Sequence, residues 1–252
     1  MSFIGILIAV AFIIIANLIE GGHPSALLNF PAFLIVIGGT VGAVCVQFPF
    51  STLKDVKRYF SWLIKPPNYD YFEMASTLFE YSEVARKQGY LALEEQLEEV
   101  SDPFLKETMS MIVDGVDKDT LIDIVQTKMS NEETRLNQVG KFYEAMGGYS
   151  PTMGILGAVL GLIHAMGLLD QPEQLGHGIA VAFIATIYGV AFANIIFLPI
   201  GNRYKLFSQE LTRYQDMIVE VAYDIINGAP TLDIRNRIVS YVDHPKFTGF
   251  DS

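Results

Sequence analysis

Four long apolar segments set the pattern of the chain, at residues 3–19, 27–46, 149–169 and 178–200. None of them contains Asp, Glu, Lys or Arg. The hydrocarbon core of a bilayer is about 30 Å thick and takes roughly 20 helical residues to cross. The pattern therefore predicts four transmembrane helices, of which the first is barely long enough.

The polar segments between and after them have helical spacing. Apolar residues recur every three or four positions in 72–88 and 91–100, as in amphipathic helices, and we expect further helices over 118–128, 132–143, 204–226 and 231–242. Ser101-Asp102-Pro103 is a helix-start signal, and Asp114-Gly115 is a stop. No strand pattern of useful length and no internal repeat is found.

The basic residues give the orientation. No Lys or Arg precedes Lys54, and none lies between Lys141 and Arg203. Basic residues stay on the cytoplasmic side of a membrane. Both termini are therefore expected in the cytoplasm, with two short outer loops.

The chain is thus predicted to be an all-α integral membrane protein. It has four transmembrane helices, a large helical cytoplasmic domain between helices 2 and 3, and a cytoplasmic C-terminal helix. The expected parts are transmembrane helices 1 and 2 in 1–50, the cytoplasmic domain in 51–146, transmembrane helices 3 and 4 in 147–202, and the C-terminal helix and tail in 203–252.

Composition agrees and excludes several functions. Of 252 residues 51% are hydrophobic and only 18% are charged, against about 25% charged in a soluble domain. A net charge of −11 without a basic cluster argues against nucleic-acid binding. Cys45 is the only cysteine, and the histidines lack metal-ligand spacing, so we expect no disulfide, metal or cofactor. The sequence contains no recognisable nucleophile–base pair, so we do not expect an enzyme.

Small residues line one face of each of the last two apolar segments. They are Gly154, Ala158, Gly161 and Ala165 in the third, and Gly178, Ala182, Thr186 or Ala185, Gly189 and Ala193 in the fourth. Such faces let helix backbones approach closely. Packing within one chain explains either face alone, whereas two such faces in one chain favour an assembly around a partner.

Thr186 and Asn194 stand out as polar residues in the fourth segment. A lone threonine in a membrane helix usually bonds its own helix carbonyl, four residues back. The functional alternative is that Thr186 lines an ion path. A membrane ion path usually needs a carboxylate, so a partner would have to supply it.

Three motifs carry a resemblance to a known family: residues 150–161 (SPTMGILGAVLG), 180–200 (AVAFIATIYGVAFANIIFLPI) and 85–95 (ARKQGYLALEE). With residues 33–40 (FLIVIGGT) and the placing of the four segments, the chain strongly resembles the flagellar motor stator A subunits, MotA and PomA, of the MotA/TolQ/ExbB superfamily. ExbB and TolQ proteins are expected to have three spans, which does not fit.

The resemblance implies a role for particular residues. Five A subunits would surround two B subunits of the MotB or PomB type, whose span carries the ion-binding aspartate beside Thr186. Pro151 and Pro199 match prolines thought to govern conformational change and gating. Arg86, Lys87 and Glu94 match charges that engage the rotor protein FliG, although such charges are equally typical of a solvated helix surface.

The resemblance also bears on the ion. Sodium-driven members have a threonine in span three where this chain has Ala158, and the loss of that oxygen favours protons. His164, near the outer end of that span, is either a proton relay or an imidazole at the membrane surface bonded to water or backbone.

The implied function is an ion-driven stator of the bacterial flagellar motor in the inner membrane. One alternative is a non-flagellar energiser of the same superfamily, which drives an envelope or defence partner. Another is a structural membrane scaffold without ion flux.

Overall fold

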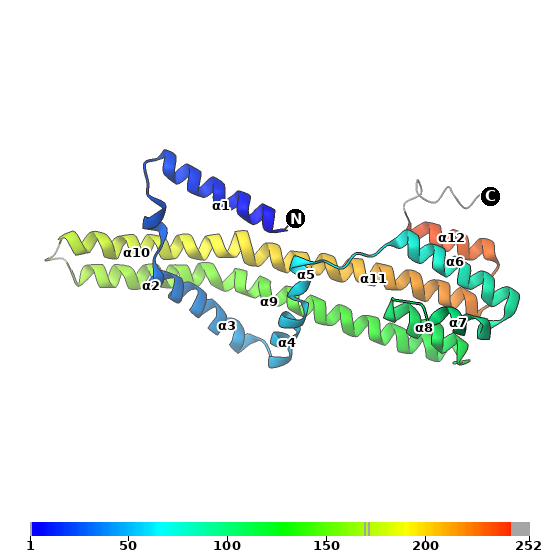
Figure 1. Ribbon diagram of the computed structural model, residues 1–252. Coiled ribbons are helices and arrows are strands. Elements are labelled where there is room, and N and C mark those ends of the chain that lie inside the picture. Colours follow the sequence, from blue (N-terminus) through cyan, green and yellow to red (C-terminus); the bar gives the residue numbers. More distant parts are fainter. Residues whose placement is uncertain (1, 169, 171, 243–252) are drawn as a thin grey trace. The chain divides into compact units, whose positions relative to one another are not determined.

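The structure is a computed structural model that describes residues 2–168, 170 and 172–242. Within these ranges the secondary structure is helical and contains no strand (Figure 1). The predicted all-helical fold class is confirmed. The chain divides into two compact units, here called unit 1 (residues 1–66 and 135–206) and unit 2 (67–134 and 207–252).

Unit 1 holds the apolar helices. α1 covers Ser2–Ile19, and a 3-10 turn at Pro24–Leu27 follows it. The second apolar helix is built from α2 (Phe30–Phe33), a π-helical segment (Leu34–Gly38) and α3 (Gly39–Gln47). The short helices α4 (Phe50–Tyr59) and α5 (Ser61–Ile64) come next.

Two very long helices contribute to both units. α9 covers Lys118–Met166. On the return, α10 (Pro172–Ala191), a π-helical segment (Phe192–Phe197) and α11 (Leu198–Ile226) follow one another without a break. Three of the apolar helices are long enough to cross a membrane, and the first, apolar over Ile4–Ile19, is shorter.

The second apolar helix begins at Phe30, three residues later than predicted. Asn29 is its N-cap, because its side-chain oxygen accepts a hydrogen bond from the Ala32 amide at 2.9 Å. Pro31 follows in the first turn, where the missing amide hydrogen costs nothing. The third apolar helix ends at Met166, and its predicted end at residue 169 lies outside the described residues, as do residues 243–252 of the tail.

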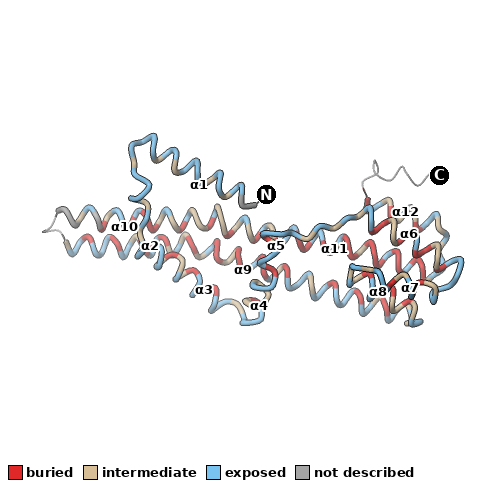
Figure 2. Tube along the Cα trace, viewed as in Figure 1, coloured by how far each residue is buried: buried red, intermediate tan, exposed pale blue. Residues whose placement is uncertain are grey.

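Unit 2 is a helical domain with its own core. Its further elements are α6 (Tyr71–Gln88), a 3-10 turn (Tyr90–Ala92), α7 (Leu93–Leu97), α8 (Pro103–Val113) and α12 (Thr231–Tyr241). These helices turn apolar faces inward, which Figure 2 shows as buried stripes. The largest fully buried side chains of this core are Leu78, Leu93, Leu105, Met109, Leu121, Met217, Ile218 and Ile238.

Two predicted elements of unit 2 differ in length. The helix expected over 91–100 is only five residues long, because Gly89 has a φ of +86° and a 3-10 turn precedes α7. The helices expected over 118–128 and 132–143 are one with the third apolar helix, since no Gly or Pro interrupts residues 118–139. The start at Asp102-Pro103 and the stop at Gly115, with a φ of +72°, are confirmed.

Candidate functional site

In unit 1 the small faces of α9 and α10 pack directly on each other. A Cβ added to Gly154 would lie 2.9 Å from the Ala185 carbonyl oxygen and 3.1 Å from the Gly189 Cα. One added to Gly161 would lie 3.0 Å from the Ala182 nitrogen. Real Cβ atoms almost never come as close as 2.9 Å to another atom and seldom as close as 3.0–3.1 Å, so the two backbones are in contact. The structure thus brings together Gly154, Gly161, Ala182 and Gly189 from the two predicted small faces.

The small faces of α9 and α10 therefore pack against each other within one chain, which is one of the two interpretations that the sequence leaves open. Gly189 shows why, because a Cβ there would lie 2.7 Å from the Ser150 carbonyl oxygen on α9. Any partner must therefore use other surfaces of these helices.

Three further glycines that sequence reasoning missed extend the same contact. A Cβ on Gly140 would lie 3.1 Å from the Gly201 carbonyl oxygen, and one on Gly147 would lie 2.6 Å from the Leu198 side chain. The signal was available, because glycines 140, 147, 154 and 161 recur every seven residues, which is two helical turns. An ion pair between Lys205 and Glu144 flanks these contacts.

Thr186 lies on α10 beside this contact. Its side chain is half-buried, and its hydroxyl donates to the Ala182 carbonyl oxygen at 3.3 Å, as expected for a lone threonine in a helix. Its Cα would be 3.4 Å from a Cβ on Gly154. Ala158 is half-buried and His164 is exposed, both on α9.

The two prolines lie at places where helix hydrogen bonding is altered. Pro151 is inside α9, and its Cα would be 3.1 Å from a Cβ on Gly189. Pro199 follows the π-helical segment, at whose end the Leu198 amide bonds the Ala193 carbonyl, five residues back. Because proline lacks an amide hydrogen, Pro151 and Pro199 donate no hydrogen bond to the preceding helical turn.

Tyr188 joins α10 to the start of the second apolar helix, a contact that the sequence did not predict. Its hydroxyl donates to the Leu27 carbonyl oxygen at 2.5 Å and accepts from the Asn29 amide at 3.0 Å. The Phe192 ring packs against the rings of Tyr188 and Phe33. One signal for this contact is present in the sequence, which is that Tyr188 lies two residues after Thr186, the candidate residue of the ion path.

In unit 2 the three charged residues that are predicted to contact the rotor lie around the end of α6. Arg86 and Lys87 occupy its last turn, and Glu94 is in the first turn of α7. All three are exposed. Arg86 donates from Nη1 to the Thr231 hydroxyl at 3.0 Å, Lys87 pairs with Glu83 on its own helix, and Glu94 makes no ion pair with any described residue.

Comparison with known proteins covers both units. Residues 3–89 match the family described as Motility protein A N-terminal, and residues 96–217 match the MotA/TolQ/ExbB proton channel family. Among the described residues, no cluster of His, Cys, Asp and Glu could hold a metal ion.

Relatives and solved structures resemble the whole chain. Motility protein A of Bacillus subtilis is 34% identical over 96% of this chain and 90% of its own length. A chain of the C. jejuni MotAB structure matches with a TM-score of 0.93 and 29% identity, covering 99% of this chain and 98% of that one. A chain of the flagellar MotAB stator complex of Bacillus subtilis matches with a TM-score of 0.89 and 32% identity, covering 100% and 99%. The chain is a multi-pass inner-membrane protein and belongs to the MotA/TolQ/ExbB proton channel family, on its motility protein A branch.

Proposed function

We propose that this chain is the A subunit of a bacterial flagellar stator, which forms an ion channel with a B subunit and converts ion-motive force into torque. The observation that carries the proposal is the match along nearly the whole chain to a solved MotAB structure, at a TM-score of 0.93. We assign no enzymatic activity to the chain.

The ion path requires a partner in this proposal. The four apolar segments contain no carboxylate, so the B subunit supplies the aspartate that binds the ion. Five A subunits surround two B subunits. Thr186 lies beside the aspartate, and its hydroxyl can turn from the Ala182 carbonyl toward the path because the 3.3 Å hydrogen bond is long.

We further propose that the ion is a proton. Sodium gives up its water only where several oxygens replace it, and Ala158 offers none. A proton needs only the carboxylate and a relay. One charge crossing 100 mV yields about 2.3 kcal/mol, so torque requires many protons per turn.

The mechanism couples protonation to a step of the ring. Protonation neutralises the B-subunit aspartate, which lets its helix move past the apolar A-subunit wall. Release to the cytoplasm restores the charge, and the ring steps by one subunit. Pro151 and Pro199, which donate no helix hydrogen bond, are the positions where the helices bend during this step. Arg86, Lys87 and Glu94 of unit 2 transmit the step to FliG.

Deletion of the gene tests the proposal. We expect paralysed cells that carry normal filaments by microscopy, with swimming restored by the gene on a plasmid. A proton uncoupler should then stop the complemented cells, whereas sodium depletion should not. Normal swimming of a strain without any other stator gene would contradict the proposal and favour the envelope energiser, which the soluble domain of its B-type partner would identify.

A further inference from the structure

The side chain of Arg86 is hydrogen-bonded to a residue near the C-terminal end of the sequence. Its Nη1 donates to the hydroxyl of Thr231, 145 residues away, at 3.0 Å. Thr231 is the first residue of α12 and is half-buried. No carboxylate among the described residues forms an ion pair with Arg86, so its charge remains available to a partner while its position is fixed.

The turn between α11 and α12, which precedes Thr231, is closed by backbone hydrogen bonds. The Gly228 amide bonds the Ile225 carbonyl and the Ala229 amide bonds the Asp224 carbonyl, each at 3.0 Å. Gly228 has a φ of +65°, so this is the Schellman end of α11, which requires a residue that tolerates the left-handed region. Pro230 then sets the N-cap of α12.

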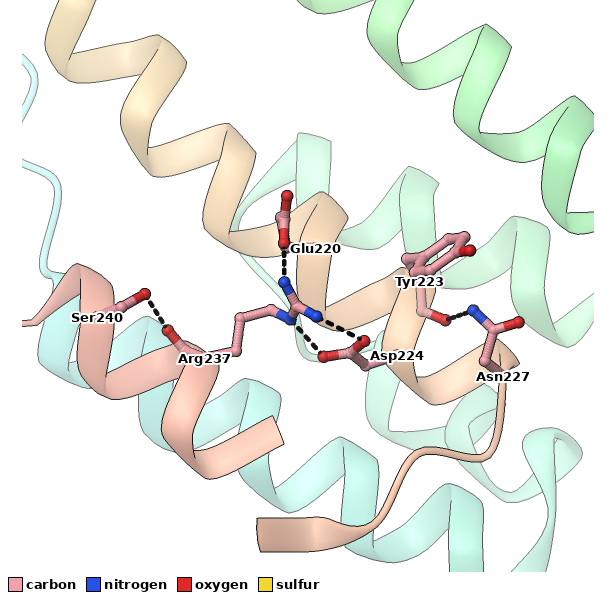
Figure 3. Close-up of polar contacts among 6 residues, drawn as sticks. All are labelled: Glu220, Tyr223, Asp224, Asn227, Arg237 and Ser240. Atoms are coloured by element: carbon pink, nitrogen blue, oxygen red, sulfur yellow. Dashed lines mark hydrogen bonds and ion pairs between the residues drawn. The ribbon is translucent and has the colours of Figure 1, made fainter. Parts of the chain in front are cut away.

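A partly buried ion pair joins α12 to α11 (Figure 3). Arg237 donates from Nε to Asp224 Oδ2 at 2.5 Å and from Nη2 to Asp224 Oδ1 at 3.2 Å, and it also pairs with Glu220. The Asp224 side chain is only 8% exposed. The hydrogen bonds that Arg237 donates to Asp224 raise the pKa of the Arg237 guanidinium, because they favour its charged form.

The end of α6 is tied to the same place. The Tyr90 hydroxyl, just after Gly89, lies 3.3 Å from the Ile225 carbonyl oxygen and 3.2 Å from that of Ile226. Its single hydroxyl hydrogen can thereby bond one of these two carbonyls at the C-terminal end of α11. α12 packs on α6, and Ile234 and Ile238 are buried in the core of unit 2.

We propose that Thr231 is a positioning residue for Arg86, and that the start of α12 is therefore part of the rotor-facing surface. The inference rests on the proposed function, because it assumes that Arg86 engages a rotor protein. An unheld arginine loses much side-chain freedom when a partner orders it. A side chain already held by Thr231 loses less, so the partner binds more tightly.

The test replaces the hydroxyl while keeping the shape. Thr231→Val removes the acceptor, and Thr231→Ser is the matched control that keeps it. Each variant is expressed with its B subunit in a strain lacking the native gene. Three quantities are measured: the amount of co-purified complex, the proton flux through the complex, and the number of fluorescently tagged complexes retained at motors.

We expect Thr231→Val to keep complex and flux while retention at motors falls roughly three- to tenfold, within the range for the cost of ordering one long side chain on binding. Thr231→Ser should behave as the unmodified chain. In an Arg86→Ala background, Thr231→Val should cause no further fall, because it acts through Arg86.

Three results would overturn the inference. The first is normal retention of Thr231→Val while Arg86→Ala is poorly retained, which leaves the proposed function intact. The second is a parallel loss of complex or flux in Thr231→Val, which makes Thr231 merely structural. The third is normal retention of Arg86→Ala, which removes the rotor role of Arg86 itself.

Discussion

At the scale of single residues, Thr186 is the sharpest test of the ion path. Its hydroxyl is bonded to its own helix, so Thr186→Val should leave folding nearly unchanged. Flux and swimming torque should fall about tenfold, the effect of losing one hydrogen bond worth about 1.4 kcal/mol in the path. Thr186→Ser keeps the hydroxyl and should stay active. Unchanged torque in Thr186→Val at normal expression would contradict the assigned role.

Asp216 on α11 offers a prediction about pH. Burial raises the pKa of its carboxyl above the ordinary 3.8, and the negative charges of Glu220 and Glu133 raise it further. The folded state therefore binds a proton more tightly than the unfolded chain, and stability falls as pH rises between the two pKa values.

Asp216→Asn removes this penalty. The purified complex should unfold at a higher temperature than the unmodified one at pH 7, and the difference should vanish below pH 3.8, where both states are protonated. The exposed Asp123 on the same chain, changed to Asn, is the control and should give no comparable gain. An equal gain at both pH values would show that charge is not the cause.

At the scale of elements, the contact between α9 and α10 sets what substitutions unit 1 tolerates. Gly189→Ala should destabilise by about 1–3 kcal/mol, because its Cβ meets the Ser150 carbonyl oxygen and backbone cannot move aside cheaply. Gly148→Ala is the matched control, since a Cβ there meets nothing within 4 Å and alanine favours the helix. Thermal unfolding of the two purified variants compares them, and equal midpoints would contradict the close contact.

Helix ends in unit 2 were predictable, whereas helix partners were not. Asp102-Pro103 and Gly228 mark their boundaries by local backbone chemistry, which the sequence carries directly. Small-residue spacing specifies a face but not what covers it, so the sequence left packing within one chain and assembly around a partner both open for Gly154 and Gly189. The hydrogen bond from Arg86 to Thr231 joins positions 145 apart and leaves no local trace.

At the scale of the whole molecule, the distribution of basic residues separates the segments expected in the cytoplasm from the loops expected on the outer side of the membrane. Residues 20–26 and 170–177 contain no Lys or Arg, whereas all 17 basic residues lie in 54–141 and 203–252. Moving a Lys or Arg cluster across the membrane is costly, so this bias predicts which loops lie outside. The exposed apolar side chains of α1, among them Leu7, Phe12 and Ile19, then face lipid or a partner rather than water.

The orientation can be measured with cysteines. In a Cys45→Ser background, Ser25→Cys in the first short loop should react with a membrane-impermeant maleimide on intact spheroplasts, because the charge bias predicts that this loop lies outside. Thr127→Cys, exposed on the unit 2 part of α9, should react only after permeabilisation. Both sites are exposed, so accessibility differs only through the membrane. The reverse labelling pattern would place unit 2 outside, where it could not reach a cytoplasmic rotor, and would refute the stator proposal together with the orientation.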